Sequence, residues 1–419
     1  MYRNLPKSVY SLAIVNFING FGNFTFPFLT LFLTLKLGYS AAEAGAFSML
    51  SMTMYVPGSL ISSKLADKMS RKTIMVVTQT LFSLSFLACG ILYSHIEWIP
   101  YILIIGLIFD GASDPARQAL HTDHTNFKNR QEAFSLFYLS YNIGFGFGPA
   151  IAGLLFTSYP RWLFLGSGII GLLATTIVGF TIHDKRPDHD MLKDSVKKNQ
   201  TDKAVEGNVF KALLSRPKLF SYIIINGIFF FCVSIVLFSL PLFASYLFKD
   251  SGPTIYGFMM SSNAVTVVLI TPFFVKLSKQ KNTLTIIIFS FILYLLGFNL
   301  LAIASTILIF VLSVITFSLG EALHATNNDY FIANHTPMGH RARFSTLISI
   351  IQGSGYAIGP LVGGQLLEIF SFKEVYAIVS IIIIICIFSL IYVRHTYIRD
   401  NEPILPKIEK TEEEQLELS

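Results

Sequence analysis

Charged side chains are scarce in this sequence. Asp, Glu, Lys and Arg together make up 13% of its 419 residues, whereas 53% of the residues are hydrophobic. Soluble domains carry about 25% charged residues, so this chain has too little charge to keep a soluble surface hydrated. Apolar runs such as 73–94 and 163–182 approach the ~20 residues that a helix needs to cross a membrane. The composition excludes a soluble protein and indicates an all-α membrane protein with many spans.

Cysteine is also rare, and its positions exclude a disulfide framework or a thiol metal site. Cys89, Cys232 and Cys386 are isolated within apolar runs, where single thiols usually pack as small hydrophobic groups. The sequence also lacks the nucleotide-binding pattern Gly-x4-Gly-Lys-Ser/Thr, which argues against ATP as an energy source. We expect no cofactor and no metal, and we find no nucleophile–base pair that would indicate an enzyme.

Twelve apolar segments are long enough to be transmembrane helices. A polar stretch separates the first six from the last six, and a polar tail follows them. The predicted organisation is an N-terminal six-helix bundle over 1–183, a cytoplasmic linker over 184–215, a C-terminal six-helix bundle over 216–395 and a cytoplasmic tail over 396–419. The predicted spans lie near 9–36, 42–63, 73–94, 99–121, 133–157, 161–183, 219–247, 254–277, 283–304, 306–330, 344–369 and 374–395.

The distribution of Lys and Arg predicts the orientation of the chain. With the N-terminus inside, 26 of these residues fall in the inner segments and 4 in the outer loops. Positive residues accumulate on the cytoplasmic side of membrane proteins, so both termini and the linker are expected in the cytoplasm. The net charge of +6 follows from this topology and does not indicate nucleic acid binding. We expect a monomer in the bilayer with a small-molecule substrate.

Two glycine-rich segments indicate an internal repeat. The segment "GFGFGPAIAG" begins at Gly144, and "GYAIGPLVGG" begins at Gly355; their Gly-Pro pairs, Gly148-Pro149 and Gly359-Pro360, lie 211 residues apart. Two related six-helix halves with a site between them near the membrane midplane are typical of secondary transporters. Small residues let helices approach closely, and proline bends them. We therefore expect both Gly-Pro pairs to act in gating, by closing the outer side of a cavity.

Three charges interrupt the fourth predicted span. Asp110, Asp114 and Arg117 follow one another at intervals of four and three residues, which places them on one face of a helix. A charge at the centre of a membrane helix costs at least about 2.5–3.5 kcal/mol, so such residues are rare and usually functional. Asp110 is the deepest, and we expect it to carry a proton. Asp114 and Arg117 have two possible interpretations. Either they form a structural ion pair, or Asp114 is a second proton site and Arg117 contacts the substrate.

The tenth predicted span carries a second group of polar residues. Glu321, His324 and Asn328 lie at intervals of three and four residues, on one face of a helix. A buried glutamate can hold a proton near neutral pH, and histidine titrates in the same range. We predict that Glu321 is a proton carrier. His324 is either its partner in protonation or a packing residue, and Asn328 is a candidate substrate contact.

Amide side chains supply further candidate substrate contacts. Asn16, Asn19 and Asn23 form a stripe on one face of the first span. Asn226 in the seventh span and Gln352 in the eleventh are weaker candidates of the same kind. Such residues either bind a substrate or hold neighbouring helices together by hydrogen bonds, and the sequence favours neither.

Several motifs resemble those of a known family. The segment "SKLADKMSRK" at 63–72 resembles the cytoplasmic signature of the major facilitator superfamily, which Leu65, Ala66, Asp67, Arg71 and Lys72 match. The segment from Gly144 resembles the antiporter signature of drug–proton exchangers, and the Gly-Glu pair at 320–321 resembles that of multidrug-type relatives. Two departures are clear: Gly20 stands where many relatives carry arginine, and the fourth span has no mid-helix arginine.

The resemblance implies a function as well as a fold. It implies two six-helix bundles that rock around a central site in a bacterial cytoplasmic membrane, with export of a small, partly apolar compound driven by proton antiport. Two alternatives stay open: a proton symporter that imports a metabolite such as a sugar or peptide, and a membrane sensor without transport.

The loop at 63–72 also has a physical interpretation of its own. Asp67 lies among four basic residues at the inner ends of two predicted helices, where it can cap a helix or pair with an arginine. We expect Asp67, Arg71 and Lys72 to act in gating, by favouring one of two conformations. The alternative is that they only anchor the loop on the cytoplasmic side.

Overall fold

The computed structural model describes residues 5–65, 69–125, 129–183, 216–278, 281–335 and 341–399. The predicted linker at 184–215, the chain beyond 399 and Asp67 lie outside these residues. The described part of the chain consists of helices and short connections, without a strand. The predicted all-α class is therefore confirmed.

Six helical spans make up the first half of the chain. The first span is broken, because Pro27 lacks the N–H that a continuous helix would use. It comprises α1 (Lys7–Phe21), the 3₁₀ turn η1 (Phe26–Phe28), α2 (Leu29–Leu31) and the π-helical turn η2 (Phe32–Lys36). The others are α3 (Ala41–Leu65), α4 (Arg71–Ile91), α5 (Ile99–Asp123, after η3 at Ile96–Trp98), α6 (Arg130–Phe156) and α7 (Arg161–Thr181).

Six long helices make up the second half. They are α10 (Pro217–Phe248), α11 (Gly252–Ser278, after η4 at Lys249–Ser251), α12 (Thr283–Ala302), α13 (Ile307–His335), α14 (Arg341–Ile369) and α15 (Phe372–Arg399). In the described chain, ten stretches are long and apolar enough to cross a membrane, and one of these holds both α10 and α11. Only α14 falls outside them, because Ser, Gly and Gln residues interrupt its apolar run.

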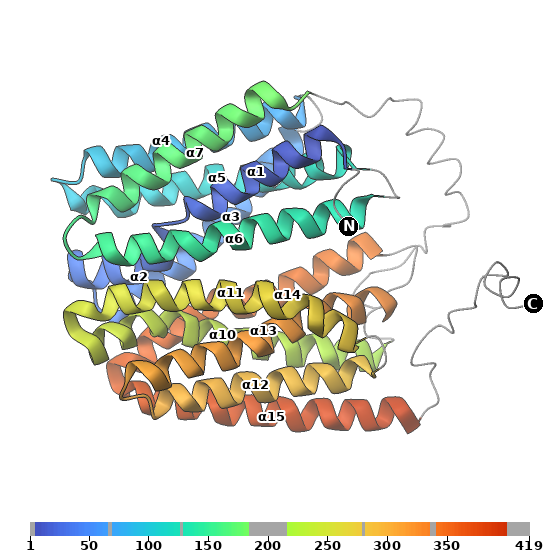
Figure 1. Ribbon diagram of the computed structural model, residues 1–419. Helices are drawn as coiled ribbons and strands as arrows, with labels where there is room; N and C mark the ends of the chain where they lie inside the picture. Colours follow the sequence, from blue (N-terminus) through green and yellow to red (C-terminus); the bar gives the residue numbers. More distant parts are fainter. Residues whose placement is uncertain are drawn as a thin grey trace, which may run out of the picture.

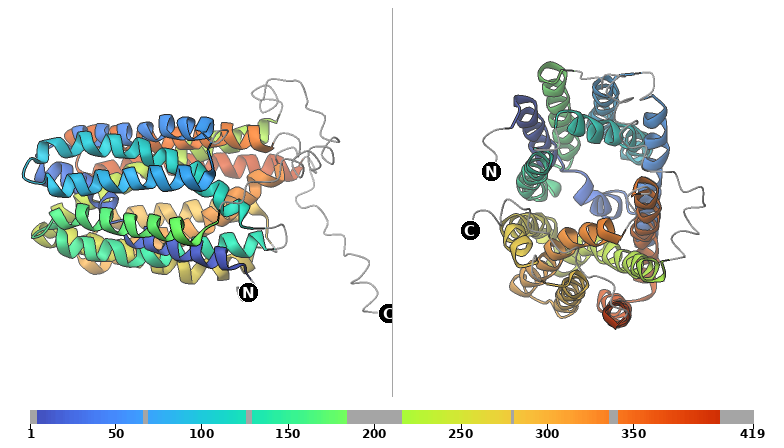
Figure 2. Two further views of the ribbon diagram at one scale, coloured as in Figure 1. Left: turned by 90° about the horizontal axis from the view of Figure 1, so that it is seen from above. Right: turned by 90° about the vertical axis from the view of Figure 1, so that its right-hand side faces the viewer.

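The two halves repeat one pattern of helix neighbours. In the first half α1 packs against α6 and α7, α5 against α3 and α4, and α4 against α7. In the second half α10 packs against α14 and α15, α13 against α11 and α12, and α12 against α15. Figure 1 shows the first group above the second, and Figure 2 shows the two groups along the helix axes. The fold is the predicted pair of pseudo-symmetric six-helix bundles.

Glycines allow the first and fifth spans of each bundle to touch along their backbones. A Cβ atom on Gly20 of α1 would overlap the carbonyl oxygen of Tyr141 on α6, and one on Gly355 of α14 would overlap that of Gly227 on α10. No larger residue fits at these points without moving a helix. The absence of an arginine at position 20 therefore has a packing reason in this chain.

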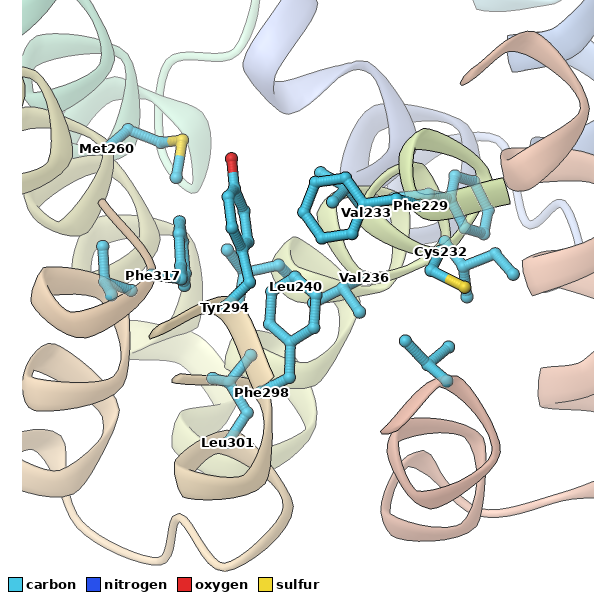
Figure 3. Packing of buried hydrophobic residues seen from close by; sticks show 14 of the residues in the cluster. Phe229, Cys232, Val233, Val236, Leu240, Met260, Tyr294, Phe298, Leu301 and Phe317 are labelled. Atoms are coloured by element: carbon cyan, nitrogen blue, oxygen red, sulfur yellow. The ribbon is translucent and has the colours of Figure 1, made fainter. Parts of the chain in front are cut away.

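Aromatic rings fill the interior of the second bundle. Figure 3 shows Phe229 of α10 among Tyr294 and Phe298 of α12 and Phe317 of α13. Phe229 stacks on Phe291 with ring centroids 3.7 Å apart, and Tyr294 stacks on Phe317 at 6.3 Å. Offset ring stacking adds to the burial of apolar surface, so this bundle is packed as one solid unit.

The bundles meet mainly along two seams, α6 with α11 and α3 with α14, and α2 makes a smaller contact with α10. We call the end where α7 ends and α10 begins the linker end, and the opposite end, where α3 begins and α14 ends, the far end. A Cβ on Gly257 of α11 would overlap the carbonyl oxygen of Pro149 on α6, and one on Gly45 of α3 would overlap that of Pro360 on α14. Both contacts lie toward the far end, and they are equivalent in the repeat.

The glycines of the two Gly-Pro pairs have a different role. A Cβ on Gly148 would lie 2.6 Å from the carbonyl oxygen of Phe21 on α1, and one on Gly359 would lie 2.8 Å from that of Phe231 on α10. Both glycines therefore serve packing within their own bundle. The prolines beside them present their carbonyl groups to the other bundle, which is where a gating role would act.

Side chains strengthen the far-end contacts. Thr254 of α11 donates a hydrogen bond to the carbonyl of Gly153 on α6, at 3.1 Å. At the other seam the backbone N–H of Ala42 on α3 donates to the Glu368 carboxylate of α14, also at 3.1 Å. The backbone contacts and these bonds together hold the far end closed.

Adding one methyl group at a seam is expected to open the far end. Gly257→Ala or Gly45→Ala forces the facing carbonyl away, so the distance between spin labels on Tyr159→Cys and Asp250→Cys should lengthen or broaden. Both sites are exposed at the far end, on different bundles, and the three native cysteines are buried. Gly353→Ala is the control, since a Cβ there meets nothing within 4 Å. Unchanged distances in both seam variants would show that these contacts do not hold the bundles together.

Candidate functional site

A cavity of about 420 Å³ lies inside the first bundle, among α1, α4, α5, α6 and α7. Its wall combines phenyl rings with amides, phenols and the charged groups of Asp110 and Arg117. The polar lining includes Asn16, Asn19, Asn23, Gln79, Gln118, His121, Tyr138 and Tyr141, and the rings are Phe26, Phe82, Phe86, Phe134 and Phe137. We expected a cavity between the two repeats, whereas this one is lined by the first bundle alone.

The three charged residues of α5 have different surroundings. The Arg117 guanidinium pairs with the Asp114 carboxylate one helical turn away, as predicted for a structural pair. Tyr55 of α3 also interacts with Asp114. Asp110 lines the cavity, and it makes no hydrogen bond or ion pair with any other residue of the described chain. Of the two carboxylates, Asp110 is therefore the one available to a proton or a ligand, and it interacts electrostatically with Arg117, which also lines the cavity.

The three asparagines of the first span, Asn16 and Asn19 of α1 and Asn23 just after it, all line the cavity. The Asn16 amide lies 3.3 Å from His121 Nε2, whose ring stacks on Phe137 at 4.2 Å. Asn23 donates to the Tyr141 hydroxyl at 3.4 Å. In the described chain, Asn19 Nδ2 and Asn23 Oδ1 are buried without a hydrogen-bond partner. These two atoms are free to bind a ligand, whereas Asn16 holds α1 to α5.

A second polar group lies inside the second bundle and is internally satisfied. The fully buried Asn226 of α10 contacts His324 Nε2 through its Oδ1 at 2.8 Å and donates to Asn328 Oδ1 at 3.0 Å. Tyr222 donates to the same Asn328 oxygen at 2.7 Å. Phe229 and other aromatic rings surround the His324 ring, and the ring centroids of Phe229 and His324 lie 5.3 Å apart. The predicted substrate contact Asn226 is thus bonded to both His324 and Asn328, and Asn328 is bonded to Asn226 and Tyr222.

Glu321 lies one turn from His324 on α13 but has different partners. The Asn263 amide of α11 donates to Glu321 Oε2 at 2.8 Å. The Glu321 carboxylate also interacts electrostatically with the phenol of Tyr138, which belongs to α6 of the other bundle. Glu321 therefore lies where the two bundles face each other. The spacing within α13 predicted neither Asn263 nor Tyr138, because each comes from a helix distant in the sequence.

Asp110 and Glu321 occupy equivalent places in the repeat. They lie 211 residues apart, the same separation as the two Gly-Pro pairs, and their helices α5 and α13 have the same neighbours in each bundle. One carboxylate lines the cavity and the other faces the opposite bundle. The two predicted proton sites are thus related by the internal symmetry, although their surroundings differ.

The linker end shows where two of the predicted gating residues bind. Arg71, at the start of α4, pairs with the carboxylate of Asp123 at the end of α5. Lys72 donates to the carbonyl of Gly179 near the end of α7, at 2.7 Å. Ser70 caps α4 by accepting from the N–H of Thr73. These contacts tie together three helix ends of one bundle.

The remaining candidates have less defined surroundings. Gln352 of α14 has a buried Nε2 atom without a partner among the described residues. The same part of the chain contains no cluster of three His, Cys, Asp or Glu side chains that could hold a metal ion.

A duplicated bundle of membrane-spanning helices with a polar cavity is the architecture of a membrane transporter. The family model of the Major Facilitator Superfamily matches residues 12–252 and 243–416. The chain therefore belongs to the Major Facilitator Superfamily, and it is a multi-pass membrane transporter and not an enzyme.

Similar proteins agree with this assignment. The uncharacterized MFS-type transporter YqjV of Bacillus subtilis is 25% identical, over 88% of each chain. A protein of Planococcus maritimus named Na(+), Li(+), K(+)/H(+) antiporter is 23% identical, over 80% of this chain and 84% of its own. Among solved structures, the nucleoside transporter NupG superposes with a TM-score of 0.73 at 14% identity, covering 93% of this chain and 99% of its own. The last likeness shows the fold alone.

Removing the central amide of the buried network is expected to destabilise the second bundle. Asn226→Ala leaves His324 and Asn328 buried without this partner, which costs about 1–3 kcal/mol. The melting temperature should fall, and a thiol-reactive dye can follow it through the three buried cysteines. Asn299→Ala is the control, because this exposed amide bonds only to its own helix, at the Leu295 carbonyl. Equal melting temperatures in both variants would mean that the network adds no stability.

Proposed function

We propose that this transporter exchanges protons for a small, partly apolar compound and exports that compound from the cell. The proton gradient alone drives it, without a cofactor. Asp110 and Glu321 carry the protons, and the cavity of the first bundle binds the compound through Asn19 and Asn23 together with the surrounding phenyl rings. The bundles rock about the cavity between two conformations.

The position of Asp110 is the observation that carries this proposal. Its carboxylate lines the same cavity as five phenyl rings and the free atoms of Asn19 and Asn23. A proton on Asp110 and a compound in the cavity therefore influence each other directly, since protonation removes a charge from the binding surface. Mutual exclusion of this kind is what antiport requires, because each ligand must leave before the other binds.

The closed far end supports alternating access. With the orientation predicted from the Lys and Arg distribution, the far end is the outer face of the membrane. The contacts of Pro149 with Gly257 and of Pro360 with Gly45 would then hold the outer face closed, as an exporter requires while it loads its compound from the cytoplasm. Opening these seams would release the compound.

A second candidate substrate is a monovalent cation. The relative named Na(+), Li(+), K(+)/H(+) antiporter favours it, as does the carboxylate of Asp110 in the cavity wall, which could bind a cation in place of a proton. The aromatic lining favours an organic compound instead. Import by symport remains the other alternative, and the direction of proton movement distinguishes it from antiport.

Neutralising either carboxylate is expected to abolish proton exchange. Liposomes containing the protein and a pH-sensitive dye are given a pH gradient, and ethidium, Na⁺ or K⁺ is then added. The wild-type protein should move protons opposite to the transported probe. Glu321→Gln and Asp110→Asn should lower this flux to that of empty liposomes, and the exposed Asp250→Asn should not.

Two results would contradict the proposal. Proton movement in the same direction as the probe would indicate a symporter. Wild-type flux in both Glu321→Gln and Asp110→Asn would remove these residues from the proton pathway.

The free amide of Asn19 is expected to affect affinity without affecting coupling. Asn19→Leu removes a hydrogen-bond donor from the cavity wall, worth about 1 kcal/mol, so the KM for the transported probe should rise about fivefold at an unchanged ratio of protons to probe. Asn299→Leu is the matched control, because this exposed amide of α12 bonds to its own helix at the Leu295 carbonyl. An unchanged KM would place the binding site elsewhere.

A further inference from the structure

Asn263 lies on α11, the helix that forms one of the two seams between the bundles. On both sides of Asn263, α11 contacts α6 directly. Six residues before it, Gly257 faces Pro149; one residue after it, the Ala264 Cβ would lie 3.7 Å from a Cβ on Gly146. A movement of α11 at Asn263 would therefore reach the contact between the bundles.

The amide of Asn263 donates both of its hydrogens to side chains of α13. Its Nδ2 atom donates to Ser318 Oγ and to Glu321 Oε2, each at 2.8 Å. The Ser318 hydroxyl in turn donates to the carbonyl of Val314 at 2.6 Å, so it is a lone pair of Ser318 that faces the amide. Asn263 is thus held in one orientation, with its donors toward Glu321.

This orientation favours the ionised form of Glu321. A carboxylate accepts a hydrogen bond from an amide N–H, and bonds to charged acceptors are stronger than neutral ones. When a proton binds to Glu321, the hydrogen bond from Asn263 loses its charged acceptor. The bond is lost altogether if the proton binds to Oε2, the oxygen that accepts from Asn263. Protonation therefore weakens the attachment of α11 to α13.

The phenols near Glu321 keep their charge state. Tyr138 of α6, Tyr294 of α12 and Tyr356 of α14 interact electrostatically with the Glu321 carboxylate. Phenols are uncharged at neutral pH, because they ionise near pH 10. Of these four side chains, Glu321 is therefore the one whose charge changes when a proton arrives. His324, one turn away on α13, is a further titratable side chain, and its Nε2 is bonded to Asn226.

We infer that Asn263 is a positioning residue that couples protonation of Glu321 to the seam between α6 and α11. It holds α11 firmly against α13 while Glu321 is ionised and less firmly when the carboxyl is protonated, so the proton shifts the balance between the closed and the open far end. The inference rests on the proposed role of Glu321 as a proton carrier, and it adds a residue that transmits the effect of the proton to the gate.

The test measures the far-end distance as a function of pH. Spin labels on Tyr159→Cys and Asp250→Cys report the separation of the two bundles in lipid nanodiscs. Wild-type protein should change its distance over a defined pH range, and Glu321→Gln should abolish this change. In Asn263→Ala the midpoint should move to higher pH by about one unit, because loss of the donor makes the ionised carboxylate less stable.

Two further variants keep the test sharp. Asn263→Ser retains one donor and should give an intermediate midpoint, which also provides a reading if Asn263→Ala does not fold. Ser262→Ala is the matched control: this neighbouring hydroxyl is exposed and donates only to its own helix, at the Phe258 carbonyl. Its midpoint should equal that of the wild-type protein.

The outcomes separate the two hypotheses. A wild-type midpoint in Asn263→Ala and Asn263→Ser, together with a lost response in Glu321→Gln, overturns the role of Asn263 and leaves that of Glu321 intact. A pH response that survives Glu321→Gln, or a wild-type distance that does not change with pH, overturns both.

Discussion

Direct contact between backbones, at points where only glycine fits, is the constraint on which the structure depends. Lipid is as apolar as the helices, so no hydrophobic force drives two membrane bundles together, and close packing must supply the attraction. Gly20 and Gly355 provide it within the bundles, and Gly45 and Gly257 provide it between them. The close approach of the first and fifth spans in each bundle and the closure of the far end both follow from these contacts.

Much of the fold was accessible from the sequence because the membrane imposes simple rules. Helix length, the scarcity of charge and the repeated Gly-Pro segments predicted twelve spans in two related halves, as the structure has them. The cost of burying charge singled out Asp110 and Glu321. The spacing of Asp114 and Arg117 made an ion pair one of two interpretations, and the structure contains that pair. Each of these inferences used residues of one helix or a direct repeat.

The partners between helices were not accessible in this way. Periodicity gives the face on which a residue lies, but not the helix that this face meets. Hence Asn263 was missed, although it donates to Glu321, and the pairing of Arg71 with Asp123 was not foreseen. Nor could the sequence show that the cavity lies within one bundle, since matching stripes of polar residues occur in both halves.

The unequal interiors of the two bundles have a consequence for how such a protein can diversify. Duplication supplied two copies of one scaffold, yet one now encloses a partly polar cavity, while the other is filled by stacked aromatic rings around a closed polar network. If the cavity is the binding site, as proposed, changes in the lining of the first bundle can alter which compound is transported. The second bundle does not need to recognise the compound, so its sequence can be conserved for the conformational change alone.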